Sequence, residues 1–214
     1  MTRSILIADD HPLFRQALAL AVGQVAPDAT VLEAGTLVAA SGMVAERGDL
    51  ALILLDLKMP GAVGFSGIAL LHAERPDVPI LVVSSAEGDH AADEARAFGA
   101  RGFLRKDADL AVIEDAISAA LAGRTPATRR SVSSSDGASD LDPIRERVAD
   151  LTPTQLKVLL AVLDGQLNKQ IAHSLGISEA TVKAHMTAIM RKLDVSNRTQ
   201  AALVARSLGL HLRH

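Results

Sequence analysis

Three carboxylates, Asp9, Asp10 and Asp56, stand where short apolar runs of the sequence end. Asp9 and Asp10 follow the first run, and Asp56 closes the third. Carboxylates gathered at one place repel one another, and a hard divalent cation bound through oxygen atoms offsets their charge. A lone Asp before Pro12 is more simply a helix N-cap, but a pair of them, and an Asp at the end of a buried strand, favour a functional site. The pattern therefore predicts a Mg²⁺ site.

Two further side chains could act on an anion held at these carboxylates. Ser84 follows the fourth apolar run, and Lys106 lies just after the fifth. Lys106 could supply a fixed positive charge, and Ser84 a hydroxyl donor. Each residue alone is more often a surface or capping residue, and only their joint placement favours the site. Neither G-x-G-x-x-G nor G-x-x-x-x-G-K-[ST] occurs, so the prediction is a phosphoryl site without a P-loop.

Residues 1–122 alternate apolar, β-rich runs with segments of helical periodicity. The predicted strands are Ile5–Ala8, Thr30–Glu33, Leu52–Leu55, Ile80–Val83 and Gly102–Leu104. The predicted helices are Leu13–Val25, Leu37–Arg47, Ile68–Glu74, Ala91–Phe98 and Leu110–Leu121. This order predicts an α/β doubly wound fold around a five-stranded parallel sheet. In such folds the sites lie at the carboxyl ends of the strands, where all the polar residues named above are expected.

The composition excludes several classes of function. The chain has no Cys, which excludes disulfides, thiolate metal sites and cysteine nucleophiles. It has no Trp and no Tyr, which argues against an aromatic cage and against a stacking platform for single-stranded nucleic acid. Apolar runs stay below the roughly 18 residues that a membrane helix needs. We therefore expect a cytoplasmic protein that does not interact with a membrane.

Charge and composition divide the chain into two domains. Residues 1–122 hold 9 Lys and Arg against 17 Asp and Glu, a net charge of −8, whereas residues 123–214 hold 13 against 8, a net charge of +5. The stretch 123–143 is rich in Ser, Thr, Gly, Pro and Arg and reads as a flexible linker. A basic domain at 144–214 suggests a polyanionic partner, although chance surface charge is the alternative.

The basic domain is predicted to be a small all-α unit. Thr152 begins the first helix in a capping box with Gln155, and Asp164-Gly165 ends it. Asn168 and Ser178 are the predicted caps of the next two helices, with Gly176 making the turn between them, and Asn197 caps a fourth. Two helices joined by a glycine turn form a helix-turn-helix unit, whose second helix enters the major groove of DNA.

The third of these helices has two different faces. Its apolar face consists of Val182, Met186, Ile189, Met190 and Leu193. The opposite face carries Lys183, Thr187 and Arg191, with the short Ala184 beside them. Such a face could follow the major groove, and periodicity alone favours an ordinary solvated basic face equally well.

Motifs in both halves resemble a known family. D-D-H at 9–11, L-L-D-L-K-M-P-G at 54–61, V-V-S-S at 82–85 and G-F-L-R-K-D at 102–107 resemble a response-regulator receiver domain, which is flavodoxin-like. N-K-Q-I-A-x-x-L-G-I-S-E-A-T-V-K-A-H from 168, followed by K-L-D-V-S-N-R-T-Q-A from 192, resembles the LuxR-type DNA-binding domain of NarL/FixJ response regulators over about residues 148–210.

The resemblance implies specific roles in the receiver. Asp56 would be the phospho-acceptor, Asp10 would bind Mg²⁺ directly, Asp9 mostly through water, and the backbone carbonyl of Lys58 would be the third ligand. Ser84 would hold a phosphoryl oxygen, and Lys106 would pair with the acyl phosphate. Phe103 stands where the family keeps a switch aromatic, and ordinary core packing of that ring is compatible with this role.

It also implies roles in the second domain. Lys183, Ala184 and Thr187 would face DNA bases, while Lys169, Ser178, Thr181 and Arg191 would be candidates for phosphate contact. Gln155 replaces the Glu that is usual in the family, which removes one charge from a local ion pair.

The sequence thus predicts a transcription regulator rather than an enzyme. A partner sensor histidine kinase would phosphorylate Asp56 with Mg²⁺, which promotes a homodimer and binding to double-stranded operator DNA. One alternative is a regulator controlled by protein contacts without phosphorylation. Another is an acid-cluster phosphotransferase or phosphatase, which would need an acid/base Asp two residues after the nucleophile, where Lys58 stands.

Overall fold

The computed structural model describes residues 3–62, 64–85, 90–125, 147–148 and 150–207. The chain forms two compact units, Met1–Asp136 and Gly137–His214, and each is described by itself. Most of the predicted linker at 123–143 lies outside the described residues, so its boundaries stay a prediction. No helix in the described part of the chain is both long enough and apolar enough to cross a bilayer.

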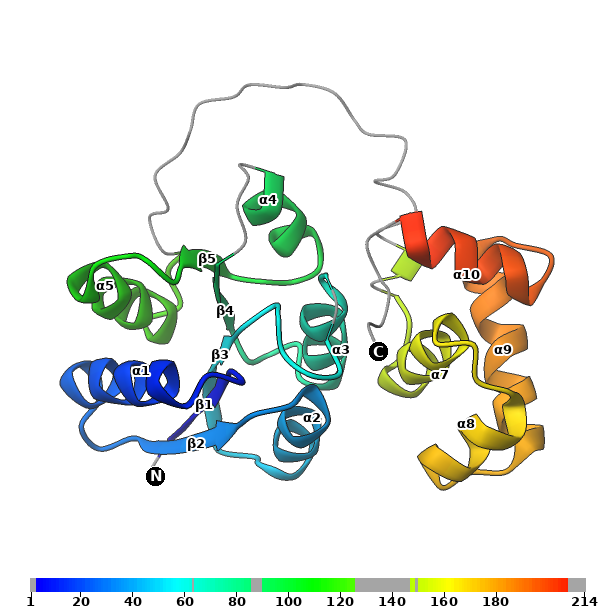
Figure 1. Ribbon diagram of the computed structural model, residues 1–214, viewed down its shortest axis with the longest axis horizontal. Coiled ribbons are helices and arrows are strands. Elements are labelled where there is room, and N and C mark those ends of the chain that lie inside the picture. Colours follow the sequence, from blue (N-terminus) through cyan, green and yellow to red (C-terminus); the bar gives the residue numbers. More distant parts are fainter. Residues whose placement is uncertain (1–2, 63, 86–89, 126–146, 149, 208–214) are drawn as a thin grey trace. The chain divides into compact units, whose positions relative to one another are not determined.

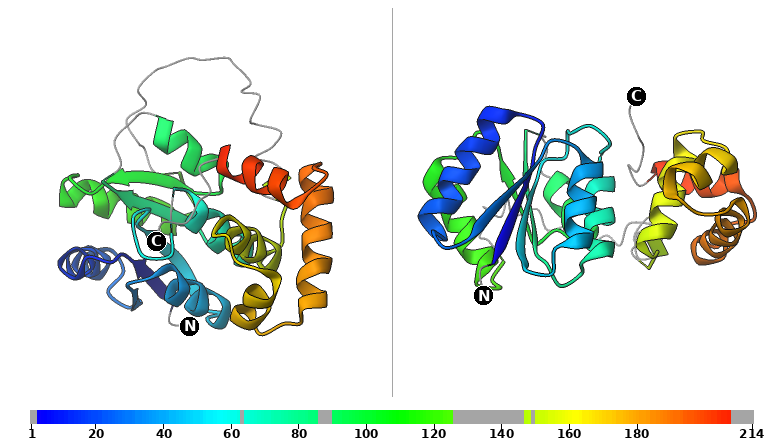
Figure 2. Two further views of the ribbon diagram at one scale, coloured as in Figure 1. Left: turned by 45° about the vertical axis from the view of Figure 1, so that its right-hand side comes forward. Right: turned by 90° about the horizontal axis from the view of Figure 1, so that it is seen from below.

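The first unit is built on a five-stranded parallel sheet, as predicted (Figure 1). Its strands are β1 Ser4–Ala8, β2 Thr30–Ala34, β3 Leu50–Leu55, β4 Ile80–Ser84 and β5 Gly102–Arg105, in the order β2-β1-β3-β4-β5. Its helices are α1 Pro12–Val25, α2 Leu37–Glu46, α3 Ser66–Glu74, α4 His90–Ala97 and α5 Leu110–Leu121. The pair α1 and α5 covers one face of the sheet and the pair α2 and α3 the other, as Figure 2 shows.

The central strands are almost entirely apolar because both of their faces are covered. All five residues of β1 and all five of β4 are buried, and Ile7, Leu54 and Leu81 belong to one core with residues of α1 and α5. Complete burial of one such side chain contributes about 1.5–3 kcal/mol. β3 begins at Leu50, before the predicted strand, and β1 begins at Ser4. The buried hydroxyl of Ser4 donates to Asp49 Oδ2 over 2.6 Å, which lets a polar residue occupy the strand.

In the described part of the second unit, the chain forms the helices α7 Pro153–Leu163, α8 Asn168–Leu175, α9 Glu179–Leu193 and α10 Arg198–Ser207. α9 packs against α7, α8 and α10 and buries Val182, Met186, Ile189 and Leu193, as its periodicity predicted, whereas Met190 of the predicted apolar face is only partly buried. The capping box of α7 is present, and the Ser178 and Asn197 side chains accept backbone N–H bonds at the starts of α9 and α10. Gly176 has φ 65°, a left-handed conformation that suits the predicted turn.

The predicted cap of α8 was wrong. Leu167 occupies the N-cap position, and its backbone N–H donates to Gln170 Oε1 over 2.7 Å. Asn168 is the first residue of the helix, and its side-chain oxygen accepts a hydrogen bond from Arg198 Nη1 over 2.8 Å instead. The side-chain oxygen of Asn168, which the sequence predicted to accept a backbone N–H bond at the start of α8, therefore accepts a bond from a residue distant in the chain.

Gly99 allows α3 to pack against the turn that precedes β5. Its φ is 101°, and a Cβ at this position would lie 2.4 Å from Cδ2 of His72 on α3. The His72 ring is half-buried, and burial lowers its pKa, so the ring that fills this space is neutral at pH 7.

We expect Gly99→Ala to lower the free energy of unfolding by on the order of 3 kcal/mol, because it adds both backbone strain and a collision with a packed ring. Urea denaturation measures the change. Gly42→Ala is the matched control, since Gly42 lies within α2 with nothing within 4 Å of its would-be Cβ. Ala is favoured over Gly there by about 1 kcal/mol. A loss of stability of similar size in both variants would contradict this interpretation.

Candidate functional site

The three predicted carboxylates come together at the carboxyl ends of β1 and β3. Asp9 and Asp56 are 1% and 2% exposed, and Asp10 beside them is exposed. One ligand atom from each of Asp9, Asp10, Asp56 and His11 lies within 4.8 Å of the others. The backbone N–H of Asp56 donates to the Ala8 carbonyl over 2.8 Å, which extends the β1–β3 pairing to the site. The sheet register therefore brings Asp56 next to the acidic pair.

Lys106 is the cation of this cluster. Its Nζ lies 2.6 Å from Asp9 Oδ2 and 2.8 Å from Asp56 Oδ2. Its backbone N–H donates to the Ser84 carbonyl over 3.0 Å, just beyond the β4–β5 pairing. Burial by itself lowers the pKa of Lys106, but the hydrogen bonds and charges of Asp56 and Asp9 outweigh it, so the pKa is raised. The ammonium group therefore stays charged at neutral pH.

The acidic atoms fit a hard cation. One Lys offsets only part of the charge of three carboxylates, two of which are buried. Asp9 Oδ2 is buried and has no hydrogen bond of good geometry, although Lys106 Nζ is close to it. A buried carboxylate oxygen without an aligned donor is a suitable ligand for Mg²⁺ or for its bound water. The cluster is of the kind that binds Mg²⁺ in receiver domains.

Three residues at the start of α1 belong to the site and were not predicted. His11, rather than Asp9 or Asp10, is the N-cap residue of α1, and its Nδ1 lies 2.7 Å from Asp10 Oδ1 and 3.0 Å from Asp9 Oδ1. Lys106 Nζ lies 4.8 Å from the centroid of the Phe14 ring, a cation–π arrangement. Arg15 donates to the Asp9 carbonyl over 2.7 Å. The sequence signal that could have identified these three residues is their position directly after the acidic pair.

The remaining predicted receiver residues lie around this cluster. Ser84 is fully buried at the end of β4, and Phe103 is buried in β5 and pairs with Val82. The Lys58 side chain is exposed, and its backbone N–H donates to Asp56 Oδ1 over 3.1 Å. Their placement is compatible with the predicted roles, which stay predictions.

The second candidate site is the exposed stripe of α9. Lys183, Ala184, Thr187 and Arg191 are all exposed, opposite the buried face. The Thr187 hydroxyl donates to the Lys183 carbonyl over 3.1 Å, so it has a local partner that it would have to leave to contact a base. The predicted phosphate candidates Lys169, Ser178 and Thr181 are also exposed.

Lys192 anchors the far end of α9 to the start of α7. Its Nζ donates to Gln155 Oε1 over 2.9 Å and to the Asp150 carbonyl over 2.7 Å. Gln155 Oε1 also accepts the Thr152 backbone N–H within the capping box. Lys192 is therefore the partner that would form an ion pair with the Glu usual at this position. Here the ammonium group instead donates a charge-assisted hydrogen bond to a neutral amide oxygen.

Comparison with known proteins places both units in families. Residues 5–118 match the response regulator receiver domain, and residues 149–205 match bacterial regulatory proteins of the luxR family. The glycerol metabolism activator of Pseudomonas putida is 40% identical over 207 residues, covering 94% of both chains. The nitrate/nitrite response regulator NarP of Escherichia coli is 36% identical over 206 residues, covering 94% of this chain and 93% of NarP.

Two solved structures show the same folds. A LuxR-family two-component response regulator from Aurantimonas sp. SI85-9A1 has 28% identity and a TM-score of 0.53, over 58% of this chain and 89% of that one. The RcsB response regulator of Salmonella typhimurium has 20% identity and a TM-score of 0.53, over 96% of this chain and 98% of that one.

We expect Lys106→Met to destabilise the metal-free protein by about 3 kcal/mol, because it leaves buried carboxylates without their cation. Mg²⁺ should then raise the melting temperature of the variant more than that of the wild type, because the ion would neutralise the carboxylates that Lys106 neutralises in the wild type. Thermal unfolding with and without Mg²⁺ measures both effects. Arg105→Met is the control, because Arg105 and Asp107 form an exposed ion pair next to Lys106. Equal Mg²⁺ shifts in the wild type and Lys106→Met would show that Lys106 and the ion do not share a site.

Proposed function

Because the chain belongs to the NarL/FixJ family of two-component response regulators, which are transcription regulators with a receiver and a LuxR-type DNA-binding domain, we propose that Asp56 is its phospho-acceptor. The observation that carries this proposal is the surroundings of Asp56. It is a carboxylate 2% exposed at a strand end, paired through Oδ2 with Lys106 and through Oδ1 with the Lys58 N–H. The phosphoryl donor is a phosphohistidine of a partner sensor histidine kinase.

Asp56 acts as the nucleophile. One of its carboxylate oxygens forms a bond to phosphorus as the bond between phosphorus and the donor nitrogen breaks, and no general base is needed because Asp56 is already ionised. Lys106 then exchanges its contact with Asp56 Oδ2 for one with the phosphoryl group, which keeps its charge paired. Asp9, Asp10, Asp56 and the Lys58 backbone carbonyl are the residues that would hold Mg²⁺, which would supply positive charge to the phosphoryl oxygens.

The geometry gives little support to an acid-cluster phosphatase. Such an enzyme needs a general acid/base two residues after its nucleophile. Lys58 occupies that position, its side chain is exposed, and only its backbone contacts Asp56. The relatives of the chain are transcription regulators as well.

Ser84 and Phe103 are the proposed route by which the phosphoryl group is sensed. Phosphorylation places up to about two negative charges beside the end of β4. The Ser84 hydroxyl would turn to a phosphoryl oxygen, and the same residue is already joined through its carbonyl to the Lys106 backbone N–H. Movement there would reach β5, where Phe103 is packed inward in this structure. The two strands form a two-state element that favours a homodimer when phosphorylated.

The exposed stripe of α9 is the proposed DNA-reading surface. Lys183, Ala184 and Thr187 would face base edges in the major groove, and Arg191, Lys169, Ser178 and Thr181 would contact phosphates. A homodimer would place two such helices on half-sites one helical turn apart, or at multiples of it, and linking the two sites raises affinity. A regulator that binds the chromosome of a bacterium works in the cytoplasm, which is the proposed location.

We expect acetyl phosphate with Mg²⁺ to add one phosphoryl group to the full-length protein and to convert it to a dimer. Asp56→Asn removes the nucleophile and should abolish both changes, which intact-mass measurement and sedimentation follow. Asp10→Asn is a second variant, because it weakens the proposed metal site but keeps the acceptor, and high Mg²⁺ should restore its labelling in part. Labelling of Asp56→Asn at the wild-type level would overturn the assignment. An unchanged sedimentation of the labelled wild type would favour control by protein contacts.

DNA binding separates base-reading residues from phosphate contacts. We expect Lys183→Ala and Thr187→Ala to lose discrimination between a duplex that the wild type selects from a randomised pool and a scrambled duplex, by about 1–3 kcal/mol. Arg191→Ala should weaken binding to both duplexes alike and reduce the salt dependence by about one released counterion. Titrations at several salt concentrations make the measurement. Equal losses on both duplexes for all three variants would remove the base-reading assignment.

A further inference from the structure

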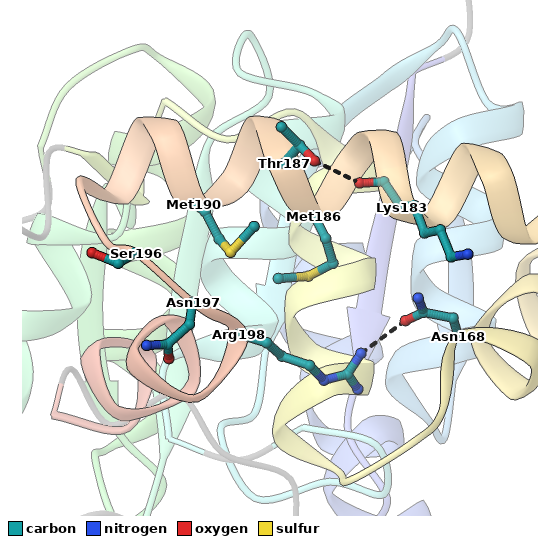
Figure 3. A pocket seen from close by; sticks show the side chains of 8 residues that line it. All are labelled: Asn168, Lys183, Met186, Thr187, Met190, Ser196, Asn197 and Arg198. Atoms are coloured by element: carbon teal, nitrogen blue, oxygen red, sulfur yellow. Dashed lines mark hydrogen bonds between the residues drawn. The ribbon is translucent and has the colours of Figure 1, made fainter.

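A pocket of about 400 Å³ lies beside α9, where the first residues of α8 and α10 approach this helix (Figure 3). Met186 and Met190 of α9 point into it, and Lys183 extends along it toward Asn168 of α8. Arg198, the first residue of α10, reaches across the pocket to the same Asn168. The pocket is thus lined both by a proposed base-reading residue, Lys183, and by the Arg198–Asn168 pair that connects α10 with α8.

Arg198 contacts the N-terminal end of α8 through two hydrogen bonds. Its Nη1 donates to Asn168 Oδ1 over 2.8 Å, and its Nη2 donates to the Gln166 carbonyl. Both acceptors are neutral and belong to adjacent points of the chain, one just before the helix and one in its first turn. A guanidinium group suits this task because its donors lie in one rigid plane, whereas a Lys ammonium is a point charge on a flexible stem.

α8 depends on such contacts because it is short. It has eight residues, and only Ile171 and Ala172 are buried. A helix of this length is marginal alone and takes its orientation from its neighbours. α8 packs extensively on α9, whereas its contact with α10 is slight within the described chain, apart from the hydrogen bonds of Arg198. Removal of those bonds should therefore loosen the first turn of α8, which carries Lys169 and lies beside Lys183.

We propose that Arg198 is a positioning residue for DNA recognition, which fixes the first turn of α8 against α9 and so sets where Lys169 and Lys183 meet the DNA. The inference rests on the proposed role of the α9 stripe. Arg198 acts through Asn168 and Gln166, not by direct contact with DNA. These bonds use two of its five N–H donors, so the salt dependence of binding is the measurement that separates a positioning role from a direct phosphate contact.

The test measures binding of the full-length protein, treated with acetyl phosphate and Mg²⁺, to the selected and the scrambled duplex at several salt concentrations. Arg198→Ala should weaken binding to the selected duplex at least about tenfold and to the scrambled duplex much less. Its salt dependence should stay that of the wild type, since a lost phosphate contact would lower the slope by about 0.9. Arg198→Lys keeps the charge but not the planar fork and should remain close to Arg198→Ala.

Two further variants separate positioning from folding. Arg206→Ala is the matched control, since Arg206 is an exposed Arg near the end of the same helix, and its binding should stay within about twofold of wild type. Asn168→Ala removes only the acceptor and substitutes a better helix former, so a loss of discrimination there cannot come from an unwound α8. The double variant should bind no worse than Arg198→Ala, because the two residues act as one unit.

Three results would overturn the proposal. A salt slope reduced by about one in Arg198→Ala, with recovery in Arg198→Lys, would identify a direct phosphate contact. Equal losses on both duplexes, accompanied by a lower melting temperature, would identify a purely structural role. Wild-type discrimination in Asn168→Ala would exclude action through α8. If Lys183→Ala leaves discrimination intact while Arg198→Ala abolishes it, the base-reading assignment of Lys183 fails. Arg198 would then position Lys169 and the other residues of the stripe.

Discussion

The pairing of Lys106 with two buried carboxylates is the interaction on which the first unit depends. Asp9 and Asp56 stand at the ends of neighbouring strands and are almost fully enclosed, and their charges would oppose folding without a cation. Lys106 comes from just after β5, so one ammonium group joins the ends of three strands of the sheet. The proposed phosphoryl transfer and Mg²⁺ binding would each change the negative charge with which this ammonium group pairs.

The surroundings of the cluster show how it is kept in place. The first turn of α1 supplies the Phe14 ring, which lies against Lys106 Nζ, and Arg15, which donates to the Asp9 carbonyl. Arg15 also donates through Nε to Glu33 Oε2 near the end of β2. The acidic site is therefore supported from the edge of the sheet as well as from its centre. Rigid support of this kind limits the positions that the side chains of the cluster can take, which would favour a defined geometry for the proposed phosphoryl transfer.

In the helical unit, the apolar core holds the helices together along their length, and polar contacts fix the ends of the helices. Val182, Ile189 and Leu193 hold α9 in the unit through buried surface. The orientation of its neighbours is set by directional bonds, from Lys192 to the start of α7 and from Arg198 to the start of α8. Apolar packing tolerates small rotations, whereas hydrogen bonds of fixed geometry do not, so these two cations limit how far the starts of α7 and α8 can turn within the unit.

The sequence by itself determined the five-stranded parallel sheet, most helix starts and the placement of Asp9, Asp10, Asp56 and Lys106 at the carboxyl ends of the strands. The periodicity of each segment and the alternation of strands and helices along the chain are properties of the sequence alone. Tertiary structure alone decided the partners of side chains with several possible roles. Asn168 could cap its own helix, yet its oxygen bonds Arg198, 30 residues away. Gln155 was predicted to close the capping box of the first helix, and only the packing of the unit showed that its Oε1 also accepts a hydrogen bond from Lys192 Nζ. A polar side chain pairs with whatever donor the fold brings nearest, and that neighbour is fixed by packing rather than by adjacent sequence.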